Sequence, residues 1–144
     1  MAIPNNRVSR FIEDQDTRVS VGLQMPLGRQ PGDSKGYFAT TSTTMEAVKE
    51  DIRMLLMTQK GERLFQPNLG LNIRRFLFEQ ITTDTEIQIE NDIVDTFEMW
   101  LPFVELREIN IDLSEQGKNK MNIEIKFNIR NAPTDLQSVG VVVE

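Results

Sequence analysis

The side chains that could do chemistry in this sequence are carboxylates and cations, because the 144 residues contain no Cys and no His. That absence excludes disulfides, thiol catalysis, Ser-His triads and the usual zinc or haem ligands. Hydrolysis of a glycosidic bond would need two carboxylates facing each other across a cleft, one of them kept protonated by burial. The chain has 22 acidic residues, but no spacing marks such a pair. We therefore predict no catalytic residue, no metal site and no cofactor.

The charge balance limits the partners. The chain has 16 basic against 22 acidic residues and a formal net charge of −6, so we expect no basic face for nucleic acid. No apolar run approaches the length of a membrane span, and the first residues lack the basic-then-apolar pattern of a signal peptide. We expect a protein that stays soluble in the cytoplasm where it is made, with neither nucleic acid nor a membrane as a partner.

A connector between two helices, within residues 58–79, is the element around which the rest is arranged. Gly61 and Gly70 suit backbone shapes that other residues resist, at a helix end and in a turn. Leu64 and Phe65 form a short apolar step, and we expect them to lock the connector to a core. The residues after the turn have helical spacing, with one apolar face and a second face that carries Arg74 and Arg75.

Residues 1–42 form an extended N-terminal arm in this interpretation, and residues 43–144 form one domain. Proline and glycine interrupt the arm, and no helical period survives in it. Five apolar residues nevertheless alternate as in a strand, namely Val19, Val21, Leu23, Met25 and Leu27. Two interpretations remain open, an arm that pairs with its own domain or a neighbour, and a flexible tail.

Three helices are predicted near residues 44–59, 72–80 and 84–101. Two carry the spacing of a capping box at their start, in the pairs Thr43 with Glu46 and Thr83 with Glu86. In the third helix, apolar residues recur at steps of four, four and three, from Ile89 through Ile93 and Phe97 to Trp100. We expect Phe97 and Trp100 to be buried beside Phe127.

The other face of the third helix is acidic, with no Lys or Arg between its charges. Its residues are Asp84, Glu86, Glu90, Asp92, Asp95 and Glu98. A face of this kind is solvated or, alternatively, docks a basic partner, for which charge would set approach and register.

A long β-hairpin follows, with strands at 107–114 and 120–130 and a turn at residues 115–119. The odd-numbered positions are apolar and should face the core. Val104 and Leu106 have the opposite parity, so their inclusion in the same strand requires a bulge near Arg107 and Glu108. The chain ends in the apolar run 139–143. The predicted class is α+β, with three helices packed on a small antiparallel sheet.

The order of residues in the connector resembles one family. The pattern T-x-K-G-x-R-x-F-x-P-x-x-G, followed by L-F-E, is that of the baseplate wedge or sheath initiator proteins of contractile phage tails, historically called gene-25-like lysozymes, and of their counterparts in type VI secretion. The matching residues are Thr58, Lys60, Gly61, Arg63, Phe65, Pro67, Gly70, Leu77, Phe78 and Glu79. The resemblance covers about residue 45 to the C-terminus and leaves out the arm.

The resemblance implies a structural virion protein of the tail baseplate, assembled in the host cytoplasm and arranged in a sixfold ring around the tube. The implied partners are the tail sheath protein, baseplate wedge proteins and tail tube or tube-initiator proteins. The first sheath ring would build on it by β-strand exchange, and we assign the pairing strand to Val139, Val141, Val142 and Val143. The alternative is that this run is an ordinary strand of the domain's own sheet. The motif residues, with Pro102, are expected to be structural or to form interfaces.

Two points qualify the resemblance. The old family name suggests a peptidoglycan-degrading glycoside hydrolase, for which the carboxylates nearest the motif are Glu50, Glu62 and Glu79. The family also has Glu-Pro-Arg after the long helix, in an ion-paired contact to the wedge core, where this chain reads Leu-Pro-Phe at residues 101–103. Glu105 and Arg107 lie close by in sequence and could supply a substitute pair.

Overall fold

The structure is a computed structural model that describes residues 11, 14, 16, 19–25, 27–29, 38–79, 82–113 and 120–143. The chain divides into two compact units, Met1–Asp51 and Ile52–Glu144. The boundary falls within α1 (Thr44–Met57), which contributes its first half to one unit and its second half to the other. The predicted turn at residues 115–119 lies outside the described residues.

In the first unit, two short strands pair within the chain. β1 (Gly22–Leu23) lies antiparallel to β2 (Thr40–Thr41), and Arg29 forms an isolated bridge with Phe38. This segment of the arm therefore pairs with the residues that lead into α1. The strand period of the sequence does not produce a buried face, because three of the alternating residues are more than half exposed, namely Val19, Leu23 and Leu27.

Side chains from two places cap the first turn of α1. The Thr43 hydroxyl accepts a hydrogen bond from the Glu46 N–H at 3.2 Å, as the capping-box spacing predicts. The Glu46 carboxylate reaches the Ser42 N–H at 3.4 Å instead of the Thr43 N–H. Asp14 in the arm accepts from the N–H of Thr44 at 2.6 Å and from its hydroxyl at 2.8 Å. The arm thus satisfies a free donor of the helix start.

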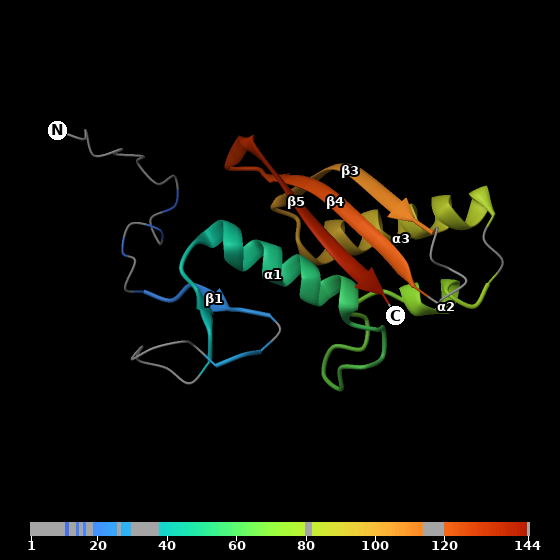
Figure 1. The fold of residues 1–144 in the computed structure, drawn as a ribbon, viewed down its shortest axis with the longest axis horizontal. Helices are drawn as coiled ribbons and strands as arrows, with labels where there is room; N and C mark the ends of the chain where they lie inside the picture. Colours follow the sequence, from blue (N-terminus) through green and yellow to red (C-terminus); the bar gives the residue numbers. More distant parts are fainter. Residues whose placement is uncertain are drawn as a thin grey trace. The chain divides into compact units, whose positions relative to one another are not determined.

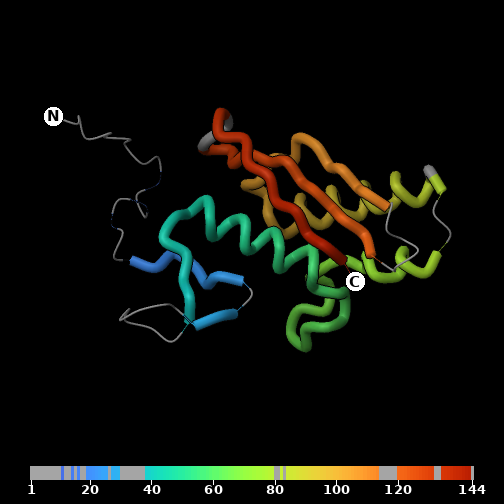
Figure 2. Tube along the Cα trace, in the orientation of Figure 1, coloured from blue at the N-terminus to red at the C-terminus, as the bar shows by residue number. Residues whose placement is uncertain are grey.

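The second unit contains a three-stranded antiparallel sheet in the order β3 (Val104–Asp112), β4 (Met121–Ile129) and β5 (Ala132–Val143). α3 (Thr83–Trp100) lies behind this sheet in the view of Figure 1, and the short α2 (Ile73–Phe76) lies near the end of β5 (Figures 1 and 2). The predicted α+β class is confirmed. Within the described part of the chain, no helix has the length and apolar character needed to cross a bilayer.

The core of this unit lies on one face of the sheet. The odd-numbered residues of β4 are buried there, as their period of two predicts. Side chains of α1, α3 and β5 complete it, in particular Ile52, Leu55, Ile89, Ile93, Phe97, Val139 and Val141.

Trp100 does not belong to this core, and the prediction that it is buried is wrong. Phe97 and Phe127 are almost fully buried, whereas Trp100 is only half-buried. The apolar stripe of α3 continues from Phe97 by a step of four to Leu101, which is buried. The step of three keeps Trp100 on the same side of a helix with 3.6 residues per turn, so its spacing does not explain its exposure. Trp100 is the last residue of α3.

The start of α3 also differs from the prediction by one residue. Thr82 is the N-cap, and its N–H donates to the Thr85 hydroxyl at 3.3 Å, which gives a capping box between these two residues. The predicted box between Thr83 and Glu86 is therefore wrong. A run of threonines offers several equivalent caps, and the buried position of Thr85 selects this one.

The remaining features of the sheet are a register shift in β3 and the pairing of the C-terminal strand. The register of β3 against β4 shifts between Leu106 and Glu108, where the change of parity in the sequence requires a bulge. β5 pairs with β4 inside the chain, from Met121 opposite Val143 to Phe127 opposite Gln137. Of the two interpretations of the C-terminal apolar run, the structure shows the strand of the domain's own sheet, in which this run is the third strand.

Candidate functional site

The connector is a loop closed at its base by backbone hydrogen bonds. The Leu71 N–H donates to the Thr58 carbonyl at 2.9 Å, and the Gly61 N–H donates to the Pro67 carbonyl at 2.8 Å. Gly61 has a φ of 89° and Gly70 a φ of 103°, so both predicted left-handed positions are confirmed. At Gly70 a Cβ atom would collide with the Thr58 carbonyl oxygen, whereas the space around Gly61 is open. Gly70 is therefore the tighter of the two constraints.

The tip of this loop is exposed, and the prediction that Leu64 and Phe65 lock it to a core is wrong. The two side chains are 94% and 97% exposed. The closed base directs the loop outward, and residues 59–68 are all exposed. A guanidinium nitrogen of Arg63 lies 3.4 Å from the Met54 sulfur, which ties the loop back to α1. Two adjacent apolar side chains at an exposed tip are suited to contact another protein.

The remaining motif residues are divided between core and surface. Leu77 is buried, whereas Lys60 and Glu79 are exposed and Phe78 is 78% exposed. Phe78 is thus a second exposed aromatic residue of the motif, besides Phe65. Within the motif, the two glycines and Leu77 have a structural role, whereas Lys60, Phe65 and Phe78 present exposed side chains.

The three carboxylates considered for hydrolysis come from different segments. Glu62 lies on the connector, and its carboxylate accepts a hydrogen bond from the Gln59 N–H at 3.0 Å. Glu50 lies on α1, and Glu79 follows α2. Desolvation, with the charge of Glu50 as the second cause, raises the pKa of Asp51. Neither Asp51 nor any of the three lines either of the two pockets described below.

The segment after α3 contains an ion pair close to Leu-Pro-Phe. Leu101 is buried, while Pro102 and Phe103 are exposed. A guanidinium nitrogen of Arg107 lies 2.9 Å from the Glu105 carboxylate, so the substitute pair suggested by the sequence forms. Its use in a contact with another protein stays a prediction.

This ion pair belongs to a small polar network on β3 and β4. The Arg107 Nε donates to the buried Asn128 side chain at 2.8 Å, and Arg130 lies 3.8 Å from Glu105. A pocket of about 450 Å³ opens beside it, with Pro102, Glu105 and Arg130 among its lining residues. Charge and apolar surface thus meet at the position where the family carries its Glu-Pro-Arg sequence.

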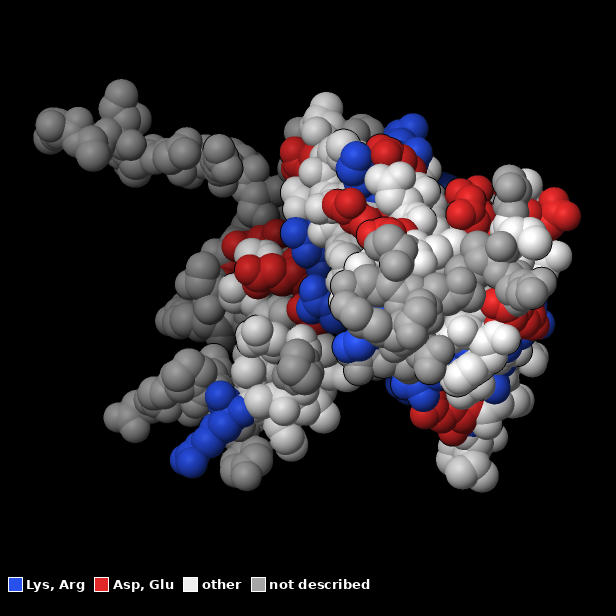
Figure 3. Space-filling model, turned by 45° about the vertical axis from the view of Figure 1, so that its right-hand side comes forward, with Lys and Arg blue, Asp and Glu red and all other residues white. Residues whose placement is uncertain are grey.

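The acidic face of α3 is exposed except at Asp92, which is half-buried and lies 3.5 Å from Arg75. Arg75 also stacks over the Phe76 ring at 4.4 Å. The docking of a basic partner on this face stays a prediction. On the face drawn in Figure 3, basic and acidic side chains lie intermixed, without an extended basic patch.

The two edges of the sheet differ in character. Neither β3 nor β5 pairs with a further described strand on its outer side. β3 is interrupted by its register shift and carries charged residues, among them Glu108, which lies 2.8 Å from Lys126. β5 has no charged residue from 136 to 143. Bulges and charges protect an edge against pairing. The pairing of β5 with β4 also shifts register, between Ala132 and Gln137, so the regular, uncharged part of β5 after Gln137 is the edge that remains open to an additional strand.

The register shows which backbone groups of β5 face outward. The Arg130 N–H donates to the Phe103 carbonyl at 3.0 Å. Backbone groups alternate in direction along a strand, so the even-numbered residues of β4 face β3 and the odd-numbered ones face β5. The odd-numbered residues of β4 oppose Val139, Val141 and Val143. By the same alternation, we expect the N–H and C=O groups of the even-numbered residues 138, 140 and 142 to face outward.

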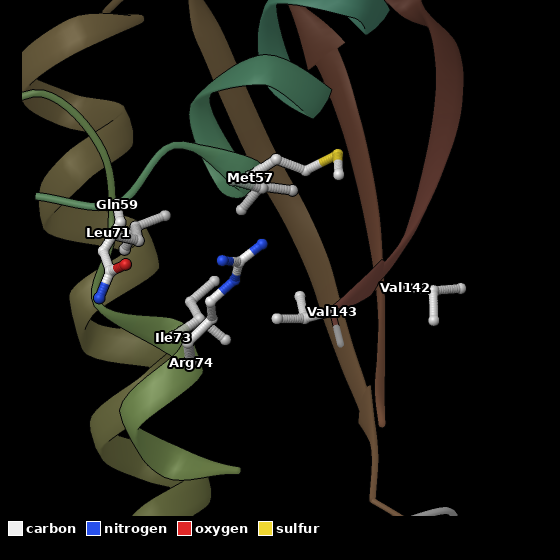
Figure 4. A pocket seen from close by; sticks show the side chains of 8 residues that line it. Met57, Gln59, Leu71, Ile73, Arg74, Val142 and Val143 are labelled. Carbon is white, nitrogen blue, oxygen red and sulfur yellow. The ribbon is translucent and has the colours of Figure 1, made fainter. Parts of the chain in front are cut away.

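A second pocket, of about 340 Å³, lies where β5 ends. Its floor is apolar and buried, formed by Leu56, Leu71, Ile73 and Val143. Its rim is exposed, formed by Met57, Gln59, Arg74 and Val142. The side chains come from α1, the connector, α2 and β5, and Figure 4 shows the Arg74 guanidinium between Met57 and Val143.

The sequence analysis did not find this pocket. Arg74 and Arg75 are adjacent residues of one type, and spacing alone placed both on the same polar face. The structure separates them, because Arg75 pairs with Asp92 whereas Arg74 lines the pocket. No local signal in the sequence could have made this distinction.

Comparison with known proteins gives a consistent result. The family described as "Baseplate wedge protein gp25" matches residues 42–134, so the match ends within β5. The protein of that name from Enterobacteria phage T4 is 24% identical over 98 residues, which cover 68% of this chain and 74% of the T4 protein. The resemblance read from the connector is thereby confirmed.

Two solved structures are similar in fold. One is a Geobacter sulfurreducens protein that carries the name tail lysozyme, with a TM-score of 0.61, 27% identity and coverage of 73% of this chain and 96% of that one. The other is a chain of the sixfold-symmetrised anti-feeding prophage baseplate, with a TM-score of 0.54, 22% identity and coverage of 83% and 81%.

Proposed function

Because the chain belongs to the baseplate wedge protein family, we propose that it is a structural component of a contractile-tail baseplate and that the outer edge of β5 starts the tail sheath. A strand from a subunit of the first sheath ring pairs with this edge and extends the sheet. The protein acts in the virion, in a sixfold ring around the tail tube, after assembly in the host cytoplasm.

The observation that carries this proposal is the contrast between the two sheet edges. β5 is uncharged from residue 136 to 143 and pairs regularly with β4 from Met121 to Phe127. Strand addition joins unpaired main-chain groups of an edge to those of an incoming strand. A Cβ atom at Gly140 would meet nothing within 4 Å, so this position of the edge tolerates a side chain. The role assigned to the C-terminal residues thus becomes that of a template, which stays in its own sheet while it binds the sheath.

The connector tip supplies a second contact in this proposal, toward baseplate wedge or tube-initiator proteins. Leu64 and Phe65 are almost fully exposed at a loop whose base is rigidly closed. Phe65→Ser should reduce incorporation into baseplates without changing the folded domain. If the Phe65→Ser variant were incorporated as well as wild type, the connector tip would not be part of the interface.

Electron microscopy of tails assembled with edge variants tests the proposal. Gly140→Pro removes the N–H that faces outward and should leave baseplates without sheath. Gly140→Val keeps that N–H and is the matched control, since a Cβ atom at this position meets nothing within 4 Å. Normal sheath growth on baseplates with Gly140→Pro would contradict the role of this edge.

Peptidoglycan hydrolysis is the alternative that the name of the Geobacter protein raises. It would require two carboxylates across a cleft, and Glu50, Glu62 and Glu79 line neither pocket. Incubation of the purified protein with peptidoglycan should release no soluble fragments. Release that disappears in Glu62→Gln would instead establish an enzyme.

A further inference from the structure

The pocket at the end of β5 lies in line with the edge that the sheath strand uses in the proposed function. Val142 and Val143 belong both to β5 and to the pocket lining. A strand that pairs with β5 along its length therefore reaches the pocket at this end. The interface is continuous from the backbone groups of β5 to the side chains of α1 and α2.

The chemistry of the pocket indicates what it binds. Its buried floor consists of four apolar side chains, which favour an apolar side chain in a volume of about 340 Å³. Arg74 stands at the exposed rim, and no described residue pairs with its guanidinium. A guanidinium beside an apolar pocket favours a carboxylate, because charge-assisted hydrogen bonds to carboxylates are strong and directional.

We propose that the pocket anchors the incoming sheath strand by one apolar side chain and that Arg74 pairs with a carboxylate next to it on that strand. This inference rests on the proposed function, since it identifies the partner residues at the same edge. Backbone pairing alone does not fix register, because every residue offers the same groups. A single anchored side chain at the strand end fixes it.

The test uses the full chain and the purified sheath subunit of the same tail, with the dissociation constant as the readout. Arg74→Ala should weaken binding roughly tenfold, since it removes one charge-assisted pair, and Arg74→Glu should weaken it further. Arg75→Ala is the matched control, because Arg75 pairs with Asp92 and does not line the pocket. Its dissociation constant should stay within about twofold of wild type.

Two further variants complete the test. Replacement of the acidic residue of the sheath strand that pairs with Arg74 by Lys should restore the binding lost in Arg74→Glu. A purely structural role of Arg74 would not allow this rescue. Gly140→Pro should abolish binding, and Ser138→Pro replaces it if thermal melting shows that Gly140→Pro does not fold. The melting temperature of every variant is measured alongside.

The outcomes separate the two proposals. Loss of binding in Gly140→Pro together with wild-type binding in Arg74→Ala and Arg74→Glu would overturn the anchor and leave edge pairing intact. Wild-type binding in a folded Gly140→Pro or Ser138→Pro variant would overturn the proposed function itself. A large fall in the melting temperature of Arg74→Ala would show that this side chain acts within the fold, and would also overturn the anchor.

Discussion

Leu64 and Phe65 in the connector are nearly fully exposed, whereas Val139 and Val141 in β5 are buried, although all four are apolar residues in short runs. The difference lies in the backbone. In β5, pairing with β4 places every second side chain on the helix-covered face. In the connector, hydrogen bonds between Thr58 and Leu71 and between Gly61 and Pro67 close the base, and Leu64 and Phe65 at the tip are not packed by the described residues. Hydrophobicity alone therefore does not distinguish core from interface.

Deletion of residues 134–144 gives the largest effect and tests the buried side of this comparison. It removes Val139, Val141 and Val143 from the core, each of which contributes about 1.5–3 kcal/mol when fully buried. That sum is comparable with the whole stability of a small domain, so we expect no cooperative unfolding transition by circular dichroism. A truncated chain that melts like the full chain would show that β5 is not part of the core.

Phe97→Ala and Trp100→Ala compare two aromatic residues on one helix. Phe97 is fully buried, so its truncation should cost about 3–5 kcal/mol. Trp100 is half-buried, and its truncation should cost roughly 1 kcal/mol. Denaturant unfolding measures both. Equal losses in the free energy of unfolding would show that Trp100 packs in the core as Phe97 does.

Gly70→Ala and Gly61→Ala test the closed base of the connector. Both positions have positive φ, but only at Gly70 does a side chain collide with the Thr58 carbonyl. We expect a loss of about 3 kcal/mol for Gly70→Ala and about 1 kcal/mol for Gly61→Ala. Gly61→Val should fall between them, at about 1–3 kcal/mol. A larger loss at Gly61 than at Gly70 would mean that the loop closes differently.

Glu108→Gln gives the smallest effect and concerns the charged β3 edge. Hydrogen bonds from Lys126 and Asn110 lower the pKa of Glu108. A lowered pKa in the folded state means that the unfolded state binds more protons. The contribution of Glu108 to stability is therefore present above its usual pKa and is lost as the pH falls through the folded value. Melting temperatures across that range should fall less with acid in Glu108→Gln than in wild type.

The sequence by itself determined those features that depend on local backbone rules. The period of two in residues 121–129 identified the central strand, and the change of parity before Glu108 required its register shift. Gly61 and Gly70 were identified as left-handed positions because few other residues tolerate them. The order of residues in the connector identified the family.

The tertiary structure decided which apolar side chains are buried in the core and which charged side chains form ion pairs. Trp100 and Phe97 both fit a helical stripe, and only packing against the sheet selected Phe97. The sequence predicts that Leu64 and Phe65 pack in the core, but the closed base of the connector places both side chains in solvent. Arg74 and Arg75 are equivalent in sequence, and their difference arises because α1, the connector, α2 and β5 converge around one of them. Such contacts join residues far apart in the chain, and no local pattern contains them.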